Sequence, residues 1–167
     1  HVSILGNEKD AEAAKLNSWA EIPLLPEDPF CLSYKGRVDL DAVLDFLCGK
    51  CRRSDTFRAG FVAGISGVVC VDLSFSDISM GGLKSLHKLL TMDREGPESS
   101  QVSVINLEGC TWVGDESKEL IVSLVCELNK RLEKGSAGVQ SVLLKGTKVS
   151  RHAMADIKKE FRYMTIT

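Results

Sequence analysis

Three segments of the chain share one pattern of apolar residues, and this internal repeat limits the fold more than any other feature of the sequence. The segments are eleven residues long and begin at Val68, Val102 and Val139, which lie 34 and 37 residues apart. In each segment the first, fourth, sixth and eleventh positions are apolar. The ninth position holds a small polar or thiol residue, namely Ser76, Cys110 or Thr147. A period of this length is typical of proteins built from stacked supersecondary units.

Each segment is followed by apolar residues at helical spacing. These residues are Leu83, Leu86 and Leu90 after the first segment, Leu120, Leu124 and Leu128 after the second, and Met154, Ile157 and Phe161 after the third. Residues three or four apart share one face of a helix, so the pattern predicts a strand and then a helix, three times over. Because one such unit cannot bury its apolar side alone, the units must stack into a parallel sheet with right-handed connections.

This pattern resembles the leucine-rich repeat, and the long helix in each unit resembles the ribonuclease-inhibitor type of that family. The resemblance implies an α/β solenoid, with a short parallel sheet on its concave face and helices on its convex face. We expect residues 28–167 to form a leucine-rich-repeat domain of about four units. We expect residues 1–27 to form an amino-terminal capping segment with a short helix at Glu8–Ala20. Two polar loops are expected at Met92–Gln101 and Lys134–Gly138.

The unit that precedes Val68 departs most from the pattern. Val38–Leu47 aligns with Ile78–His87, and this alignment makes Phe30–Tyr34 the first strand. In that register Cys31 and Ser33 point inward. Terminal repeats are often atypical because they cap the stack, so we predict an atypical first unit.

Composition limits the kinds of partner. The chain has 167 residues, of which 44% are hydrophobic and 26% charged, as in an ordinary globular protein. Its 21 Lys and Arg and 23 Asp and Glu give a net charge of -2, without the basic excess of a nucleic-acid binder. No apolar run is long enough to span a bilayer, so we expect no membrane insertion. Several of the six cysteines sit in apolar runs, which favours a reducing, intracellular location; we expect the cytoplasm, with an organelle as the alternative.

Cys48-Gly-Lys-Cys51 has the spacing of a dithiol redox centre or of half a zinc site. The alignment places both cysteines at the carboxyl end of a helix that begins near Asp39, where the helix dipole does not stabilise a thiolate. No second cysteine or histidine pair with zinc-finger spacing accompanies them. We therefore interpret the pair as structural, with a redox-sensitive surface pair or an intermolecular metal site as alternatives.

Other residues that could carry chemistry fit structural roles better. His87 and His152 are isolated imidazoles, Asp115 reads as an acidic residue at a helix start, and Trp112 occupies the inward eleventh position. We find no Ser-His-Asp arrangement, no phosphate-binding loop and no pair of carboxylates for which a catalytic role fits better than a structural one. We therefore predict no catalytic residues, no metal, no cofactor, no small-molecule substrate and no enzymatic activity.

The outward positions of the strands become neighbours if the units stack. They combine apolar and polar side chains, which is typical of a contact surface. The residues that we predict to bind a partner are Phe30, Tyr34, Asp72, Ser74, Phe75, Val104, Asn106, Glu108, Leu143 and Lys145.

The resemblance implies a non-enzymatic protein-protein interaction module, a scaffold or complex subunit whose concave sheet binds another protein. One alternative is a GTPase-activating regulatory protein, because Ran GTPase-activating proteins share this repeat type. The other is a thiol or metal protein that uses Cys48 and Cys51.

Overall fold

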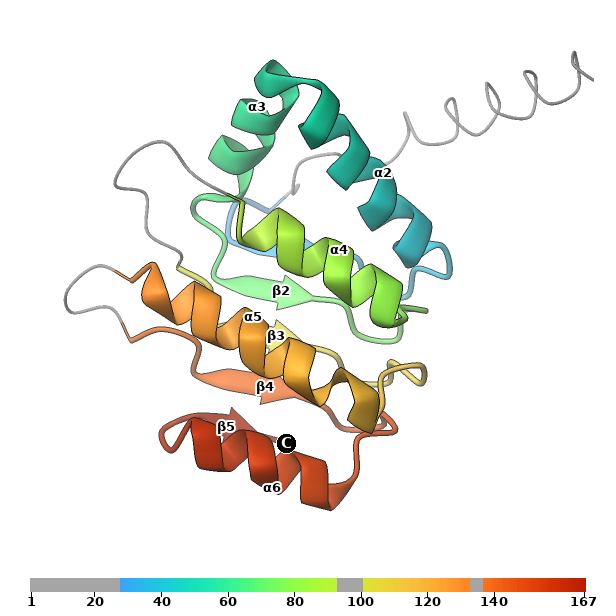
Figure 1. Ribbon diagram of the computed structural model, residues 1–167, viewed down its shortest axis with the longest axis vertical. Coiled ribbons are helices and arrows are strands. Elements are labelled where there is room, and N and C mark those ends of the chain that lie inside the picture. The colour runs from blue at the N-terminus through green and yellow to red at the C-terminus, as the bar shows by residue number, and fades with distance from the viewer. Residues whose placement is uncertain (1–27, 93–100, 133–136) are drawn as a thin grey trace, which may run out of the picture.

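The protein has a mixed α/β fold whose five described strands form one parallel sheet (Figure 1). A computed structural model describes residues 28–92, 101–132 and 137–167. The strands are β1 (Cys31–Ser33), β2 (Cys70–Asp72), β3 (Val104–Asn106), β4 (Ser141–Leu143) and β5 (Thr165–Ile166). They lie in chain order, every neighbouring pair is parallel, and the sheet is open. The predicted parallel sheet is therefore confirmed.

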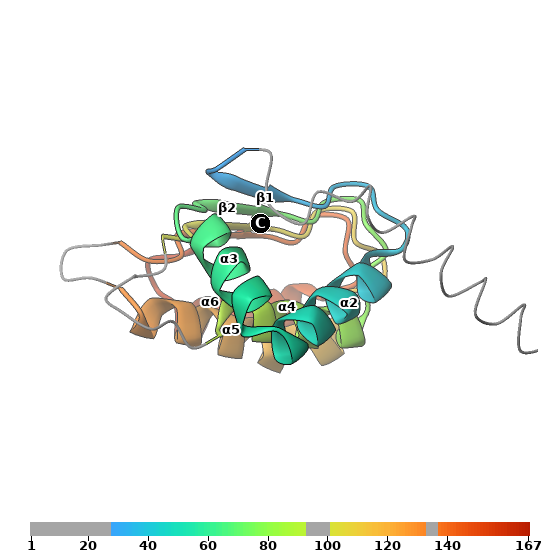
Figure 2. The ribbon, with the colours of Figure 1, turned by 90° about the horizontal axis from the view of Figure 1, so that it is seen from above.

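Five described helices lie on one side of this sheet. They are α2 (Leu40–Arg53), α3 (Asp55–Ile65), α4 (Met80–Leu90), α5 (Lys118–Lys130) and α6 (Arg151–Glu160), and a short 3-10 turn, η1 (Asp115–Ser117), precedes α5. Figure 2 shows all five helices on the same side, and no described helix covers the other side, which we call the open face. The predicted alternation of strand and helix is confirmed.

The core lies between the sheet and the helices, where the repeated apolar positions meet. The fourth and sixth positions of the three segments are all buried: Val71, Ile105 and Val142, and Leu73, Leu107 and Leu144. The fourth-position residues pair in register across β2, β3 and β4. The ladder continues beyond the strands, because Leu73 N donates to Asn106 O at 2.9 Å and Leu107 N donates to Leu143 O at 2.9 Å. The repeat therefore determines the inner face of the sheet.

The ninth position bonds the backbone of the turn that follows each strand. The hydroxyl of Ser76 donates to Leu73 O at 2.6 Å, and the hydroxyl of Thr147 donates to Leu144 O at 2.6 Å. The Cys110 thiol donates to Leu73 O at 3.0 Å, which joins two units. These side chains add to the backbone bonds of the same turns, in which Ser76 N donates to Leu73 O at 3.2 Å and Thr147 N donates to Leu144 O at 3.1 Å.

The predicted register of the first strand is wrong by one residue. Cys31 pairs with Cys70 and Ser33 pairs with Asp72, so Leu32 and Tyr34 point into the core and are buried. Side chains alternate along a strand, so a slip of one position exchanges the buried and exposed sets. Burial of Leu32 and the Tyr34 ring favours this register over one that buries Cys31 and Ser33.

The predicted inward position of Trp112 is also wrong. Trp112 is 62% exposed, and Val113 is buried in its place. Val113 follows Leu107 by six positions, whereas Ile78 follows Leu73 by five, so the third unit has one extra residue in its turn. The smaller side chain fills the site that Ile78 fills in the second unit.

Several predictions concern parts of the chain outside the described residues. One is the amino-terminal cap over residues 1–27, with its helix at Glu8–Ala20. The others are the loops at 92–101 and 134–138, most of whose residues are not described. In the part of the chain that the structure does describe, every helix is too short or too polar to serve as a membrane span.

Candidate functional site

The open face of the sheet carries two rows of side chains that the predictions placed there. Register across the strands puts Asp72, Asn106 and Leu143 in one row. Val104 lies in the adjacent row with Cys70 and Ser141, and all of these side chains are half-buried. The structure therefore brings apolar and polar groups together on one surface.

Two polar residues of this face also shape the turns that follow the strands. Asp72 Oδ1 accepts from Ser74 N at 3.0 Å, and Asn106 Oδ1 accepts from Glu108 N at 3.0 Å. Such bonds from Asp and Asn side chains to the backbone two residues on are typical of tight turns. Asp72 and Asn106 consequently fix the direction of the chain and leave only part of their hydrogen-bonding capacity for a partner.

Phe75 occupies a backbone conformation that the other units reserve for glycine. Its φ is 58°, and the equivalent residues Gly36, Gly109 and Gly146 have φ of 72°, 68° and 77°. The same hydrogen-bond ladder holds these turns: Phe75 N donates to Glu108 O at 2.7 Å and Gly109 N donates to Lys145 O at 2.8 Å. Left-handed backbone costs a residue with a side chain roughly 1–2 kcal/mol, and an aromatic residue there is rare. For the stability of the fold alone, glycine would be the more favourable residue at position 75.

The Phe75 ring lies against the next unit and remains 63% exposed. A Cβ atom on residue 109 would overlap Cδ1 of Phe75, so the ring rests on the bare backbone of Gly109. Lys35 Nζ lies 5.9 Å from the centroid of the ring, within the range of a cation–π contact. Phe75 thus presents an aromatic surface at the carboxyl ends of the strands.

Glu108 and Lys145, which were predicted to line the sheet itself, lie in the turns that follow β3 and β4. Glu108 is half-buried and Lys145 is exposed. Ser74 is different, because it is buried. The turn of the first unit lies against it, with Gly36 N donating to Ser74 O at 2.9 Å, so Ser74 does not belong to an accessible surface.

The two first-strand residues predicted for the surface do not join it. Tyr34 is buried in the core as a result of the corrected register. Phe30 is exposed, but its carbonyl accepts from Val69 N at 2.8 Å, which places it where the strands begin. Phe75 lies where the strands end, so the two aromatic residues occupy opposite ends of the sheet.

The sequence reasoning missed a pair of cysteines on the open face. Cys31 and Cys70 lie opposite one another on β1 and β2. Burial raises the pKa of both thiols, that of Cys70 to about 11. Leu32 and Tyr34 are two positions apart, so burying both puts Cys31 on the opposite face of the strand. This spacing was the signal in the sequence. Both groups are thiols at neutral pH, and a thiolate is the reactive form.

The Cys48-Gly-Lys-Cys51 pair lies within the last two turns of α2, close to where the sequence placed it. The Cys48 thiol donates to Ser85 O at 3.3 Å, and burial raises its pKa. Burial raises the pKa of Cys51 to about 11. Across residues 28–92, 101–132 and 137–167, no three His, Cys, Asp or Glu side chains gather in a way that could hold a metal ion. The pair behaves as packing between helices.

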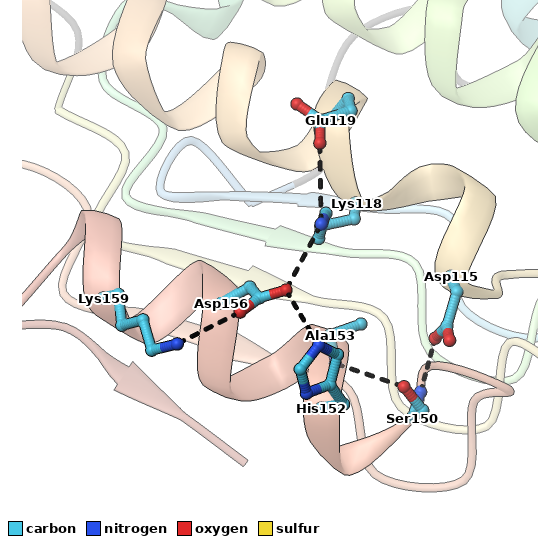
Figure 3. Close-up of polar contacts among 8 residues, drawn as sticks. All are labelled: Asp115, Lys118, Glu119, Ser150, His152, Ala153, Asp156 and Lys159. Atoms are coloured by element: carbon cyan, nitrogen blue, oxygen red, sulfur yellow. Dashed lines mark hydrogen bonds and ion pairs between the residues drawn. The ribbon is translucent and has the colours of Figure 1, made fainter.

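A polar cluster that includes serine, histidine and aspartate joins the third and fourth units (Figure 3). Asp156 on α6 contacts Lys118 Nζ at 3.4 Å, Lys159 Nζ at 3.4 Å and His152 Nε2 at 3.6 Å. Burial acts to raise the pKa of Asp156, but the hydrogen bonds from the lysines and the charge of His152 together lower it. The carboxylate of Asp156 thus links α6 to α5.

The serine of this cluster caps a helix. Ser150 Oγ accepts from Ala153 N at 3.1 Å at the start of α6, and Ser150 N donates to Asp115 Oδ1 at 2.6 Å. The bond from the Ser150 backbone lowers the pKa of Asp115. A hydroxyl that accepts in a cap is typical of helix termini, so the cluster stabilises the junction between units.

No family model matches the chain, and no curated protein matches it in sequence. Its function must therefore be inferred from the geometry of its own residues.

Proposed function

We propose that this chain is a non-enzymatic interaction module of the leucine-rich-repeat type, which binds another protein on the open face of its sheet. The repeated segments, the strands in chain order and the helices on one side support a short solenoid arc. In such an arc the sheet face without helices is the concave side. A narrow arc of this kind fits a helix or a loop of the partner.

Phe75 is the observation that carries the proposal. The three equivalent turns use glycine, yet this turn holds an exposed aromatic residue in left-handed backbone. Strained positions of this kind persist where the surrounding structure enforces them, and they concentrate at functional sites. Aromatic residues also dominate the binding energy of protein interfaces. Partner binding explains why the chain keeps a side chain that its backbone disfavours.

Other residues of the open face and of its turns support the same proposal. Val104 and Leu143 add apolar surface on the open face, and Glu108 and Lys145 add charge beside it. An apolar centre with charged residues around it is the usual composition of an interface. The working surface is therefore the open face together with the turns at the carboxyl ends of β2, β3 and β4.

The test measures binding to a partner identified by cross-linking from the open face. A photo-reactive amino acid at position 145 would capture the partner, and calorimetry with the purified partner would give its affinity. Phe75→Ala and Glu108→Lys are each expected to weaken binding by roughly 1–3 kcal/mol. Tyr163→Ala is the matched control, because Tyr163 is fully exposed and lies in the turn before β5.

Circular dichroism would check that each variant folds. If Phe75→Ala and Glu108→Lys bind the partner as tightly as the original chain, the open face is not the working surface. If Tyr163→Ala weakens binding as much as Phe75→Ala and Glu108→Lys do, binding is not specific to the open face. Either result would overturn the proposal.

A further inference from the structure

A second surface lies at the edge of the fold where the first helices of the first two units, α2 and α4, begin. It is a hollow of about 380 Å³. Its lining residues come from three successive units and are Val38, Asp39, Asp41, Ala42, Asp77, Ser79 and Trp112. Val38 is 79% exposed and Trp112 is 62% exposed. Two exposed apolar side chains therefore line the hollow together with its polar groups.

The polar lining of the hollow is acidic. Three aspartates line it, and no Lys, Arg or His does. Asp39 already pairs with Arg37, through Nε at 2.9 Å and Nη2 at 3.3 Å. Asp41 accepts from the backbone N–H and the hydroxyl of Ser79 but has no cationic partner among the described residues.

Asp77 is the least engaged carboxylate of the hollow. Its backbone N–H donates to Arg37 O at 2.8 Å, while its side chain makes no ion pair or hydrogen bond within the described residues. Among the described residues, neither Asp41 nor Asp77 forms an ion pair. An incoming positive group would gain from both of them.

We propose that this hollow receives an arginine side chain from a basic segment of the protein partner. A guanidinium can stack on an indole and form a paired hydrogen bond with a carboxylate, and the hollow offers both surfaces at once. Cations of the chain itself lie against one indole and one carboxylate of this lining. Lys148 Nζ lies 5.9 Å from the centroid of the Trp112 ring, and Arg37 holds Asp39 through two nitrogens.

This assignment rests on the proposed function, because it supplies the chemistry of the same partner. Phe75 would provide the apolar anchor, and the hollow would select for positive charge. Complementary charge beside an apolar anchor sets partner choice more than it sets affinity. The partner segment is therefore basic.

The test uses the fluorescence of Trp112. Trp19 and Trp112 are the two tryptophans of the chain, so Trp19→Phe leaves Trp112 as the reporter. The probe is an acetylated glycine-rich peptide with two arginines, and the matched probe carries citrulline, which keeps the shape but removes the charge. We expect a saturable change with the arginine peptide that weakens as salt is added. The citrulline peptide should bind at least about twofold more weakly than the arginine peptide.

Variants locate the binding. Asp77→Asn should weaken binding of the arginine peptide by about two- to fivefold, since it removes one charge from the hollow. Asp45→Asn removes the same charge from the exposed side of α2, outside the hollow, and should leave binding unchanged. Equal binding of both peptides, equal effects of both variants, or no saturable signal would each overturn the assignment.

Phe75→Ala separates this inference from the proposed function. The variant should bind the arginine peptide normally, because Phe75 does not line the hollow. Loss of the protein partner with Phe75→Ala, together with a flat peptide titration, would leave the interaction module standing and remove the arginine site. A normal peptide titration with unchanged partner binding would instead place the partner on the hollow and contradict the role of the open face.

Discussion

The turn at Phe75 and the turns at Gly109 and Gly146 have the same backbone but different residues. All three have positive φ, and the backbone N–H groups of Phe75 and Gly109 continue the hydrogen-bond ladder beyond the strands. Glycine adopts this conformation without strain, whereas phenylalanine does not. The two glycine turns have the residue that suits this backbone, whereas the phenylalanine turn has a residue that the fold accommodates at a cost in stability. Positions that the units share serve the fold, and departures from the repeat mark candidates for function.

The largest effect should come from shared core positions. Leu73→Ala, Leu107→Ala and Leu144→Ala should each lower the free energy of unfolding by about 2–5 kcal/mol, because each opens a cavity between the sheet and the helices. Urea denaturation would measure the loss. Loss below 0.5 kcal/mol at any of the three would contradict their equivalence in the core.

A smaller loss is expected when the glycine next to Phe75 is replaced. Gly109→Ala should cost about 1–3 kcal/mol, because it combines left-handed strain with overlap between the new Cβ and the Phe75 ring. Gly146→Ala is the control, since a Cβ there meets only Gly109 backbone atoms at 3.3 Å and 3.4 Å. In a double-mutant cycle, Phe75→Gly should recover part of the cost of Gly109→Ala and none of the cost of Gly146→Ala.

The first unit offers a test of another departure from the repeat. Tyr34 stands where other units have leucine, and its hydroxyl is a buried polar group without a hydrogen-bond partner in the described structure. Tyr34→Phe should therefore raise the free energy of unfolding by about 1 kcal/mol at pH 7. Tyr163→Phe, at the exposed tyrosine, should change nothing. A loss of stability in Tyr34→Phe would mean that the hydroxyl has a role in the fold.

Burial also raises the pKa of Tyr34 to about 12, which gives this residue a pH signature. Because the pKa is higher in the folded state than in the unfolded chain, ionisation of this group leaves the free energy of unfolding unchanged below pH 10 and lowers it as pH rises from 10 toward 12. Denaturation between pH 9 and 12 should show a steeper loss for the original chain than for Tyr34→Phe. Identical slopes would contradict the buried position of the hydroxyl.

The smallest effect is expected at the junction of the third and fourth units. The pKa of Asp115 and of Asp156 is lowered in the folded state, so their contributions are complete above the ordinary carboxyl pKa, about 4, and are lost as pH falls below it. Asp115→Asn should lower the melting temperature slightly at pH 7, and this difference should shrink as pH falls below about 4. An equal effect at pH 7 and below about pH 4 would mean that charge is not involved.

The sequence carried enough information for the strands from Val68 onward and for the buried leucines, because three copies of one pattern fix the register between units. The first strand was misplaced because its register was carried back from the helix alignment, and the step from Ser33 to Leu40 is one residue shorter than the step from Asp72 to Met80. Trp112 was misplaced because an extra residue in the turn is invisible when the segments are aligned without gaps. Only the structure could show that Val113 fills the core.

For the candidate surface, sequence reasoning located Phe75, Val104, Glu108, Leu143 and Lys145 correctly on or beside the open face. It could not see the strain at Phe75, although glycine at the same position in two other units was a visible signal. The hollow beside Trp112 was unpredictable, because it depends on side chains from three units whose turns differ in length.

Phe75→Gly is the most direct test of the claim that this residue serves binding at the expense of the fold. One sample of the variant would be measured twice, by urea denaturation and by calorimetry with the cross-linked partner. The free energy of unfolding should rise by about 1 kcal/mol, because glycine relieves the left-handed backbone. Binding should weaken at least as much as in Phe75→Ala. A variant that is less stable and still binds normally would show that Phe75 is part of the fold, and the account of this surface would be wrong.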